Sequence, residues 1–250
     1  MDYLKVEGQS AIVTGAAQGI GEGIAKAFAE QGIRVIVCDI QIEKGMEVVA
    51  DIRKRGGIAE FCLCDVTKVA DVEKAVDMAI SKFGSLEIII NNAGIGSNCH
   101  PVEDLTDEEW NQMMDVDVKS AFNFTRAAIP HMKERKYGKI VNISSGGGIT
   151  GMLNLSHYST AKAALFGFTK SVAREVATFG INVNCIATPT TLTPATTAYD
   201  YDENWEEELK LIPKGRIATP KDIADMALYL VSQSSEYVTG QVISPNGGKR

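Results

Sequence analysis

The first half of the chain alternates short apolar runs with longer segments whose apolar residues recur at helical spacing. Runs such as Val35–Cys38 and Glu87–Ile90 are almost continuously apolar, which is typical of strands buried on both faces of a sheet. Strand and helix alternate three times: Ser10–Val13 with Ile20–Glu30, Arg34–Cys38 with Ile42–Arg55, and Ala59–Cys64 with Val69–Phe83. This alternation predicts an α/β fold, a doubly wound parallel sheet with helices on both faces and right-handed crossovers.

The second half continues the pattern. The predicted elements are a strand at Leu86–Asn91, one long helix at 106–132, a strand at Lys139–Ile143, a helix at Tyr158–Phe179, a strand at Asn182–Ile186, a helix at Pro220–Ser232 and a last strand at Gln241–Ser244. The stretch at about 188–212 breaks the rhythm, being rich in Thr, Pro, Tyr and acids. It follows a strand whose carboxyl end opens into the crevice where such sheets bind ligands. We expect a substrate lid there; a surface excursion without a role is the alternative.

Composition narrows the classes of function. The 250 residues, 45% hydrophobic and 23% charged, suit one globular domain spanning 1–250. A net charge of −7 gives no reason to bind nucleic acid or an anionic membrane, and no apolar stretch approaches the length of a membrane span. The N-terminus has no export pattern. We therefore expect a cytoplasmic protein that acts on a small molecule.

The five cysteines form no CxxC pair and have no nearby set of histidines. We expect reduced thiols, most of them buried, and no metal site. Cys99, beside His100, is the one candidate for a ligand or nucleophile, although no second cysteine or acidic partner accompanies it.

A glycine-rich turn, TGAAQGIG at Thr14–Gly21, joins the first predicted strand to the first helix. Glycines at such a turn allow a tight bend, a close backbone approach to a pyrophosphate and close helix packing, and the helix N-terminus favours the negative charge. Asp39 ends the second strand, where a carboxylate can accept hydrogen bonds from the adenosine ribose and repel a 2′-phosphate. This favours NAD over NADP. Alternatively, Asp39 caps the next helix. Asp65 and Val66, at the end of the third strand, either flank the adenine or belong to a helix cap.

Tyr158 and Lys162 are four residues apart in HYSTAK, and so share one face of a helix. An ammonium within reach of a tyrosine favours the phenolate, which can accept a proton from a substrate hydroxyl. Ser144 and Ser145 end the preceding strand and bring a hydroxyl to the same crevice.

The sequence resembles the short-chain dehydrogenase/reductase family over essentially its whole length. The motifs that carry the resemblance are Thr14–Gly21, DV at Asp65–Val66, NNAG at Asn91–Gly94, ISS at Ile143–Ser145 and YSTAK at Tyr158–Lys162. The resemblance implies a single Rossmann-type domain and hydride transfer between a nicotinamide ring and a carbinol or carbonyl carbon. It also implies a homotetramer, built through the long central helices and the C-terminal segment.

Residue roles follow from the resemblance. The serine 13 residues before the tyrosine, Ser145, holds the substrate oxygen, with Ser144 as the alternative. Tyr158 exchanges the proton, and Lys162 supports the tyrosine and binds the nicotinamide ribose. Thr193 matches the threonine that binds the carboxamide. The predicted cofactor contacts are Gly15, Gln18, Gly19, Ile20, Gly21, Asp39, Asp65, Val66, Asn91, Ala93, Gly94, Tyr158, Lys162, Thr191 and Thr193.

Two positions depart from the family pattern. Asp117 stands where the family has an asparagine that supports a proton relay, and we count it among the catalytic candidates. Its carboxylate either alters the relay, weakens the site or is tolerated. Thr188–Pro189 replaces the usual Pro–Gly before the lid. Pro189 fixes its own φ, so the lid is expected to start along a different path.

The leading functional prediction is NAD-dependent oxidation of a secondary alcohol, namely a small hydroxy compound, a polyol or a hydroxyacyl derivative, to the ketone. Reduction of a 3-oxoacyl thioester is an alternative, and a dinucleotide-binding sensor or scaffold with weakened catalysis is another. Candidate substrate contacts lie on loops expected around the reacting carbon: Ser97, Asn98, Gly147, Met152, His157, Tyr199, Tyr201 and Trp205.

Overall fold

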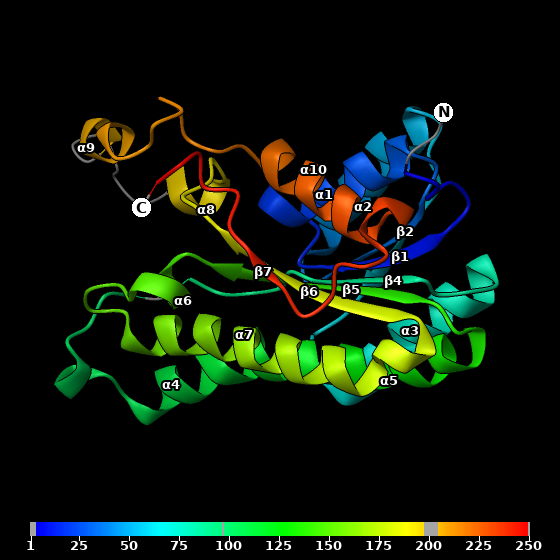
Figure 1. Cartoon of the computed structure of the whole chain (residues 1–250), viewed down its shortest axis with the longest axis horizontal. Coiled ribbons are helices and arrows are strands. Elements are labelled where there is room, and N and C mark those ends of the chain that lie inside the picture. The colour runs from blue at the N-terminus through cyan, green and yellow to red at the C-terminus, as the bar shows by residue number, and fades with distance from the viewer. Residues whose placement is uncertain (1–3, 97, 198–204, 250) are drawn as a thin grey trace.

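One parallel sheet organises the chain. The computed structural model describes residues 4–96, 98–197 and 205–249. Within them, seven strands lie in the order β3-β2-β1-β4-β5-β6-β7 (Figure 1). The strands are β1 Ser10–Thr14, β2 Arg34–Asp39, β3 Ala59–Leu63, β4 Ile88–Asn91, β5 Gly138–Ser145, β6 Ile181–Thr188 and β7 Val242–Ile243. The predicted doubly wound α/β fold is confirmed.

Helices cover both faces of the sheet because the central strands are buried along their whole length. Figure 1 shows α1 (Gly19–Glu30), α2 (Ile42–Lys54) and α10 (Pro220–Val231) on one face, and α3 (Val69–Phe83), α5 (Ser120–Arg135) and α7 (Ser156–Val176) on the other. The apolar core has two parts accordingly. Phe28 and Ile223 belong to the first; Phe124 and Val176 belong to the second.

Short elements complete the described chain. They are η1 Val102–Asp104, α4 Asp107–Met114, α6 Gly147–Thr150, η3 Ala177–Phe179, α8 Pro194–Thr197, α9 Trp205–Lys210 and η4 Gln233–Ser235. Thr106 caps α4 in a reciprocal arrangement with Glu109, as capping boxes do. Among the described helices, none is both long and apolar enough to span a membrane.

The long helix predicted at 106–132 is confirmed as an unbroken helical segment from Asp107 to Arg135, but this helix is not regular. The structure has α4, then a π-helical turn, η2 (Asp115–Lys119), and then α5. A π turn inserts a residue without interrupting the apolar periodicity enough to be seen in the sequence. It turns Asp117 inward, so that this acidic residue is only 2% exposed.

The cysteines follow the sequence prediction. All five are free; Cys38, Cys62, Cys64 and Cys185 are buried, and Cys99 is exposed.

Candidate active site

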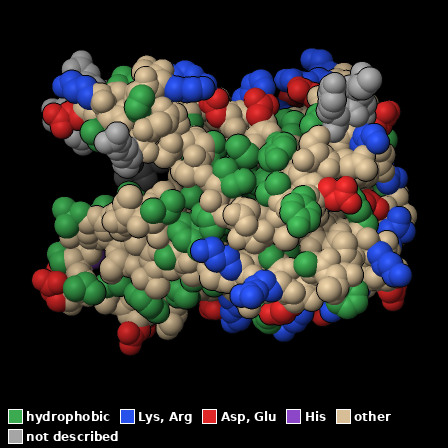
Figure 2. Space-filling view, in the orientation of Figure 1, with side chains coloured by type: hydrophobic (Ala, Val, Ile, Leu, Met, Phe, Trp, Pro, Cys, Tyr) green, Lys and Arg blue, Asp and Glu red, His purple; other side chains and the backbone are tan. Residues whose placement is uncertain are grey.

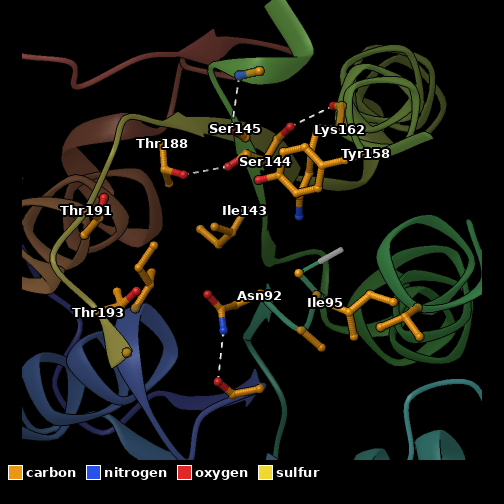
Figure 3. Close-up of a pocket in the computed structure, with 18 of the residues that line it drawn as sticks. Asn92, Ile95, Ile143, Ser144, Ser145, Tyr158, Lys162, Thr188, Thr191 and Thr193 are labelled. Atoms are coloured by element: carbon orange, nitrogen blue, oxygen red, sulfur yellow. Dashed lines mark hydrogen bonds between the residues drawn. The ribbon is translucent and has the colours of Figure 1, made fainter. Parts of the chain in front are cut away.

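A cavity of about 1220 Å³ opens at the carboxyl edge of the sheet. It lies where the strand order reverses between β1 and β4, the position at which doubly wound sheets bind ligands. Figure 3 shows side chains from β5, α7 and the segments after β1, β4 and β6 converging on it. The volume exceeds the ordinary range of small-molecule pockets, which leaves room for a dinucleotide and a second ligand.

The glycine-rich turn forms one end of this cavity. Gly15 has φ +61°, and a Cβ there would come within 2.9 Å of the Ala93 Cα. Gly19, also at positive φ (+64°), begins α1, whose N-terminus has no side-chain cap. Its first-turn N–H groups therefore remain available to an anion. The cradle fits the pyrophosphate of a dinucleotide.

Asp39 fixes the geometry of this end. Its carboxylate accepts N–H donors from Ala17 and Gln41, both at 2.9 Å, and it lines the cavity while only 6% exposed. Each oxygen retains acceptor capacity, so the side chain can order the turn and also receive ribose hydroxyls. Sequence reasoning missed Lys44, whose ammonium donates to Gln18 Oε1 at 2.8 Å beside this end.

Other predicted cofactor contacts divide into two groups. Gln18, Ile20, Asp65, Val66, Ala93, Gly94, Thr191 and Thr193 line the cavity with Gly15, Gly19 and Asp39. Gly21 and Asn91 do not line it. Gly21 packs so closely on Gly15 and Asn92 that a Cβ would not fit, and the Asn91 amide donates to Asn142 Oδ1 at 2.8 Å. Asp65 accepts hydrogen bonds from the N–H and the hydroxyl of Thr67. These bonds, followed by the interaction with Lys68, lower the pKa of Asp65, although its partial burial acts to raise it.

Two further residues of this region escaped the sequence prediction. Asn92, rather than Asn91, lines the cavity. Its amide donates to the Thr14 and Gly15 carbonyls, and Figure 3 draws one of these two bonds. Thr14 Oγ1 accepts the N–H groups of Asn92 and Ala93, both at 2.9 Å. These bonds tie the end of β1 to the end of β4, which holds the floor of the cavity.

The predicted catalytic side chains Ser145, Tyr158 and Lys162 meet at the other end of the cavity (Figure 3). Tyr158 and Lys162 lie one turn apart on α7, with the Lys162 Nζ 5.5 Å from the centre of the tyrosine ring. Ser145 ends β5, and its Oγ accepts the Gly147 N–H at 3.1 Å. The Ser145 hydroxyl proton is therefore free to be donated to a substrate oxygen.

The structure gives different roles to Ser144 and Ser145, the two candidates that the sequence offered for the substrate-binding serine. Ser144 is 2% exposed, and its Oγ donates to the Lys162 carbonyl at 2.7 Å. Its own carbonyl accepts the Thr188 hydroxyl at 2.9 Å. Ser144 thus ties β5 to α7 and β6, whereas the Ser145 hydroxyl faces Gly147 at the cavity wall.

Asp117 makes a buried ion pair with Lys162. Its Oδ2 lies 2.7 Å from the Lys162 Nζ, and neither side chain is more than 9% exposed. Its Oδ1 accepts the Ile95 N–H at 3.0 Å. Burial alone would lower the pKa of Lys162, but the charge of Asp117, followed by Tyr158, raises it above its ordinary value. Asp117 does not line the cavity, so it acts on the site through Lys162.

The candidate lid and substrate contacts are only partly described. Gly147 and Met152 line the cavity; Asn98 is exposed and His157 is fully buried outside the lining. Ser97, Tyr199 and Tyr201 lie outside the described residues, as does the side chain of Trp205. Thr188, at the first unusual position, is the last residue of β6. At the rim of the cavity, Glu208 Oε1 of α9 accepts hydrogen bonds from the Thr190 hydroxyl at 2.7 Å and from the Lys249 ammonium at 2.6 Å.

Comparison with known proteins agrees with this geometry. Residues 15–250 match the family described as enoyl-(acyl carrier protein) reductase. The 3-oxoacyl-[acyl-carrier-protein] reductase FabG of Chlamydia muridarum is 39% identical over 241 residues, 96% of each chain. The FabG of Thermotoga maritima is 35% identical over 245 residues, 98% of this chain and 99% of that protein.

Solved structures extend the likeness to the fold. A 7α-hydroxysteroid dehydrogenase complexed with NADH and 7-oxoglycochenodeoxycholic acid superimposes with a TM-score of 0.95 at 34% identity, covering 99% of this chain and 96% of that one. A protein described as an NAD(P)-dependent gluconate 5-dehydrogenase from Beutenbergia cavernae, with bound NADP, gives 0.91 at 32% identity, covering 97% of each chain. With the glycine-rich turn, the Ser–Tyr–Lys group and the sheet order, these matches show that the chain belongs to the short-chain dehydrogenase/reductase family of oxidoreductases.

Proposed function

We propose that this protein transfers a hydride between a secondary alcohol and NAD, giving the ketone. The observation that carries the proposal is the convergence of Ser145, Tyr158 and Lys162 on the cavity whose other end is formed by the glycine-rich turn and Asp39. NAD, when bound, supplies the hydride acceptor. The charged and hydrogen-bonding side chains of the site bind and orient the cofactor and the substrate, and they transfer the proton.

Each residue has a role that its geometry supports. The Ser145 hydroxyl donates to the substrate oxygen and orients it. Tyr158 accepts the hydroxyl proton as the carbonyl forms, and returns it in the reverse direction. The Lys162 ammonium stabilises the phenolate and holds a ribose hydroxyl. Asp117 is a positioning residue, because it keeps Lys162 charged and in place. Holding these groups together gives the rate advantage of oriented reactants.

Cofactor preference rests on Asp39. A 2′-phosphate would face its buried carboxylate, which favours NAD. Lys44 beside Gln18 opposes this preference, since its ammonium would attract the phosphate. We expect Asp39→Asn to lower the ratio of the NADH affinity to the NADPH affinity, and Lys44→Gln to raise it. Titration of the fluorescence of the reduced cofactors measures both affinities. Equal ratios in all three proteins would contradict the assignment.

The decisive test of the reaction is Tyr158→Phe. A screen of secondary alcohols with NAD and NADP first identifies an accepted substrate. The variant should lose NADH formation on it while retaining NAD binding, because the aromatic ring remains and only the hydroxyl that exchanges the proton is removed. Undiminished turnover would refute the proposal, and NADH binding without turnover in the wild type would favour the sensor or scaffold.

Reduction of a 3-oxoacyl thioester is the second candidate. Curated relatives named as 3-oxoacyl-[acyl-carrier-protein] reductases support it, and the same Ser145, Tyr158 and Lys162 would serve it. Assaying 3-oxoacyl thioesters with NADH beside the alcohol screen decides between the two.

A homotetramer in the cytoplasm is the assembly and location that we propose. Exposed Phe122 on α5 and Phe179 after α7 suit contacts between the long central helices. Sedimentation analysis of the wild type and Phe122→Ser tests the assembly: the variant should shift toward smaller species.

A further inference from the structure

We infer that the substrate carries a sizeable hydrocarbon group, which binds to an apolar lip formed by Ile149, Met152, Leu153 and Leu155. This inference rests on the proposed function and names the substrate class of that site. It selects a larger apolar alcohol or ketone over a polyol or a small hydroxy acid.

The lip begins at the reacting end of the cavity. Ile149, Met152 and Leu155 line the same cavity as Ser145 and Tyr158. A Cβ placed on Gly147 would lie 2.7 Å from the Met152 Sδ and 3.5 Å from the Ser145 Oγ. The Met152 thioether therefore lies next to the serine that orients the substrate oxygen. A hydrocarbon chain attached to the carbinol carbon can pass directly onto it.

The lip exposes an unusual amount of apolar surface. Ile149 is 58% exposed, Met152 45% and Leu153 89%. Figure 2 shows the molecule hollowed between the part that carries α8 and α9 and the part that carries α6, with hydrophobic side chains along the lower edge. Neighbouring exposed apolar side chains beside a cavity mark a binding surface, because leaving them in water is costly.

Hydrogen bonds hold the lip in this exposed position. Gly151 turns the chain at φ +74°, and the Met152 N–H donates to Ser159 Oγ at 3.0 Å. The Leu155 N–H donates to the Met152 carbonyl at 3.2 Å, and the His100 N–H donates to the Asn154 carbonyl at 2.8 Å. Leu153 therefore projects from an anchored loop. A preformed surface binds without an ordering cost.

Charges around the reacting end are already paired within the described residues. Lys162 pairs with Asp117 and Asp115 with Lys119, while Lys249 pairs with Glu208 at the rim. A charged substrate would lose water there without gaining an unpaired counter-ion among the described side chains at this end of the cavity. An apolar group loses nothing in the same exchange.

The test is a series of 2-alkanols from 2-propanol to 2-octanol, oxidised with NAD. We expect kcat/KM to rise about threefold for each added methylene until the lip is covered. Met152→Ser and Leu153→Ser should each lower the ratio of kcat/KM for 2-octanol to that for 2-propanol about fivefold. Ile58→Ser is the matched control, because Ile58 is 54% exposed just before β3, at the opposite edge of the sheet; it should leave the ratio unchanged.

A binding measurement separates this inference from the proposed function. Calorimetry gives the Kd of 2-octanone and 2-butanone for the complex of the protein with NADH. Tighter binding of 2-octanone without turnover would support the lip and overturn the proposed function. Turnover with equal kcat/KM at every chain length, unmoved by Met152→Ser, would overturn the lip and leave the proposed function standing. Equal weak binding without turnover would overturn both.

Discussion

Two lysines are buried at opposite edges of the sheet, and their surroundings differ. Lys162 faces the cavity at the carboxyl edge, with a carboxylate 2.7 Å from its Nζ. Lys139, only 2% exposed near the start of β5, donates instead to the neutral amide oxygen of Asn182 at 2.8 Å. Burial lowers the pKa of Lys139 to about 8. At Lys162 the Asp117 carboxylate overcomes the same effect of burial, and the pKa is raised.

The difference shows what a buried charge requires. Moving an ammonium out of water favours its neutral form, and a neutral hydrogen-bond acceptor only partly compensates. A carboxylate keeps the charge at neutral and alkaline pH. Of these two buried lysines, Lys162 is the one that stays charged at alkaline pH, and the Asp117 carboxylate holds that charge.

Replacing each lysine by methionine should give the largest difference between the two sites, both in kcat/KM and in the free energy of unfolding. Lys162→Met should lower kcat/KM by about 10²–10⁴-fold, because proton transfer loses its support. It should also lower the free energy of unfolding by about 3 kcal/mol or more, since Asp117 is left buried without its counter-ion. Lys139→Met should leave kcat/KM unchanged. Steady-state kinetics and denaturant titration measure both effects, and equal kinetic losses would refute the comparison.

Asp117→Asn removes the charge while preserving an acceptor for the Ile95 N–H. Burial should then dominate at Lys162, and its pKa should fall. The alkaline limb of kcat/KM, where Lys162 loses its proton, should move to lower pH by about one unit. Asp225→Asn is the control: it changes an exposed carboxylate that is paired with Lys221 on α10 and does not line the cavity, and it should leave the profile in place. An unmoved limb in Asp117→Asn would contradict the role given to this pair.

Stability should depend on pH through Lys139. Its pKa is about 8 in the folded protein and about 10.4 when unfolded, so between these values the unfolded chain binds more protons. The free energy of unfolding should therefore rise with pH across this window, by about 3 kcal/mol. Denaturant titrations of the wild type and Lys139→Met from pH 7.5 to 10.5 give the difference. The raised pKa of Lys162 has the opposite sign: its stabilisation is complete below about 10.4 and is lost at higher pH.

The sheet and most of the site were predictable because both depend on local pattern. Continuous apolar runs marked the strands, and the spacing of Tyr158 and Lys162 placed them on one helix face. The π turn was not predictable, since it adds one residue to a helix without a distinctive residue type. The sequence therefore singled out Asp117 but could not place its carboxylate against Lys162.

Neighbouring residues with similar side chains were the second difficulty. Asn91 and Asn92 lie at the end of β4, and Ser144 and Ser145 are the last two residues of β5. Sequence alone does not assign different roles to the two members of each pair. The geometry of the strand ends decides this: Asn92 lines the cavity and Asn91 bonds to Asn142. Lys249 was missed because it is 41 residues from its partner Glu208, a separation at which no periodicity operates.

Lys249, at the carboxyl edge like Lys162, is the third lysine of the comparison, and its replacement has the smallest expected effect. Its side chain is 30% exposed and that of Glu208 is 22% exposed, so water screens the pair. Although burial raises the pKa of Glu208, its bonds to Lys249 and Thr190 hold that pKa below its ordinary value. Lys249→Met, Glu208→Gln and the double variant should give a coupling energy of about 0.5–1 kcal/mol. Because Glu208 belongs to α9, the single variants should raise KM for the alcohol about threefold with kcat unchanged. A coupling energy near that of the buried Asp117–Lys162 pair, or a fall in kcat alone, would show that this pair belongs to the chemistry rather than to the rim.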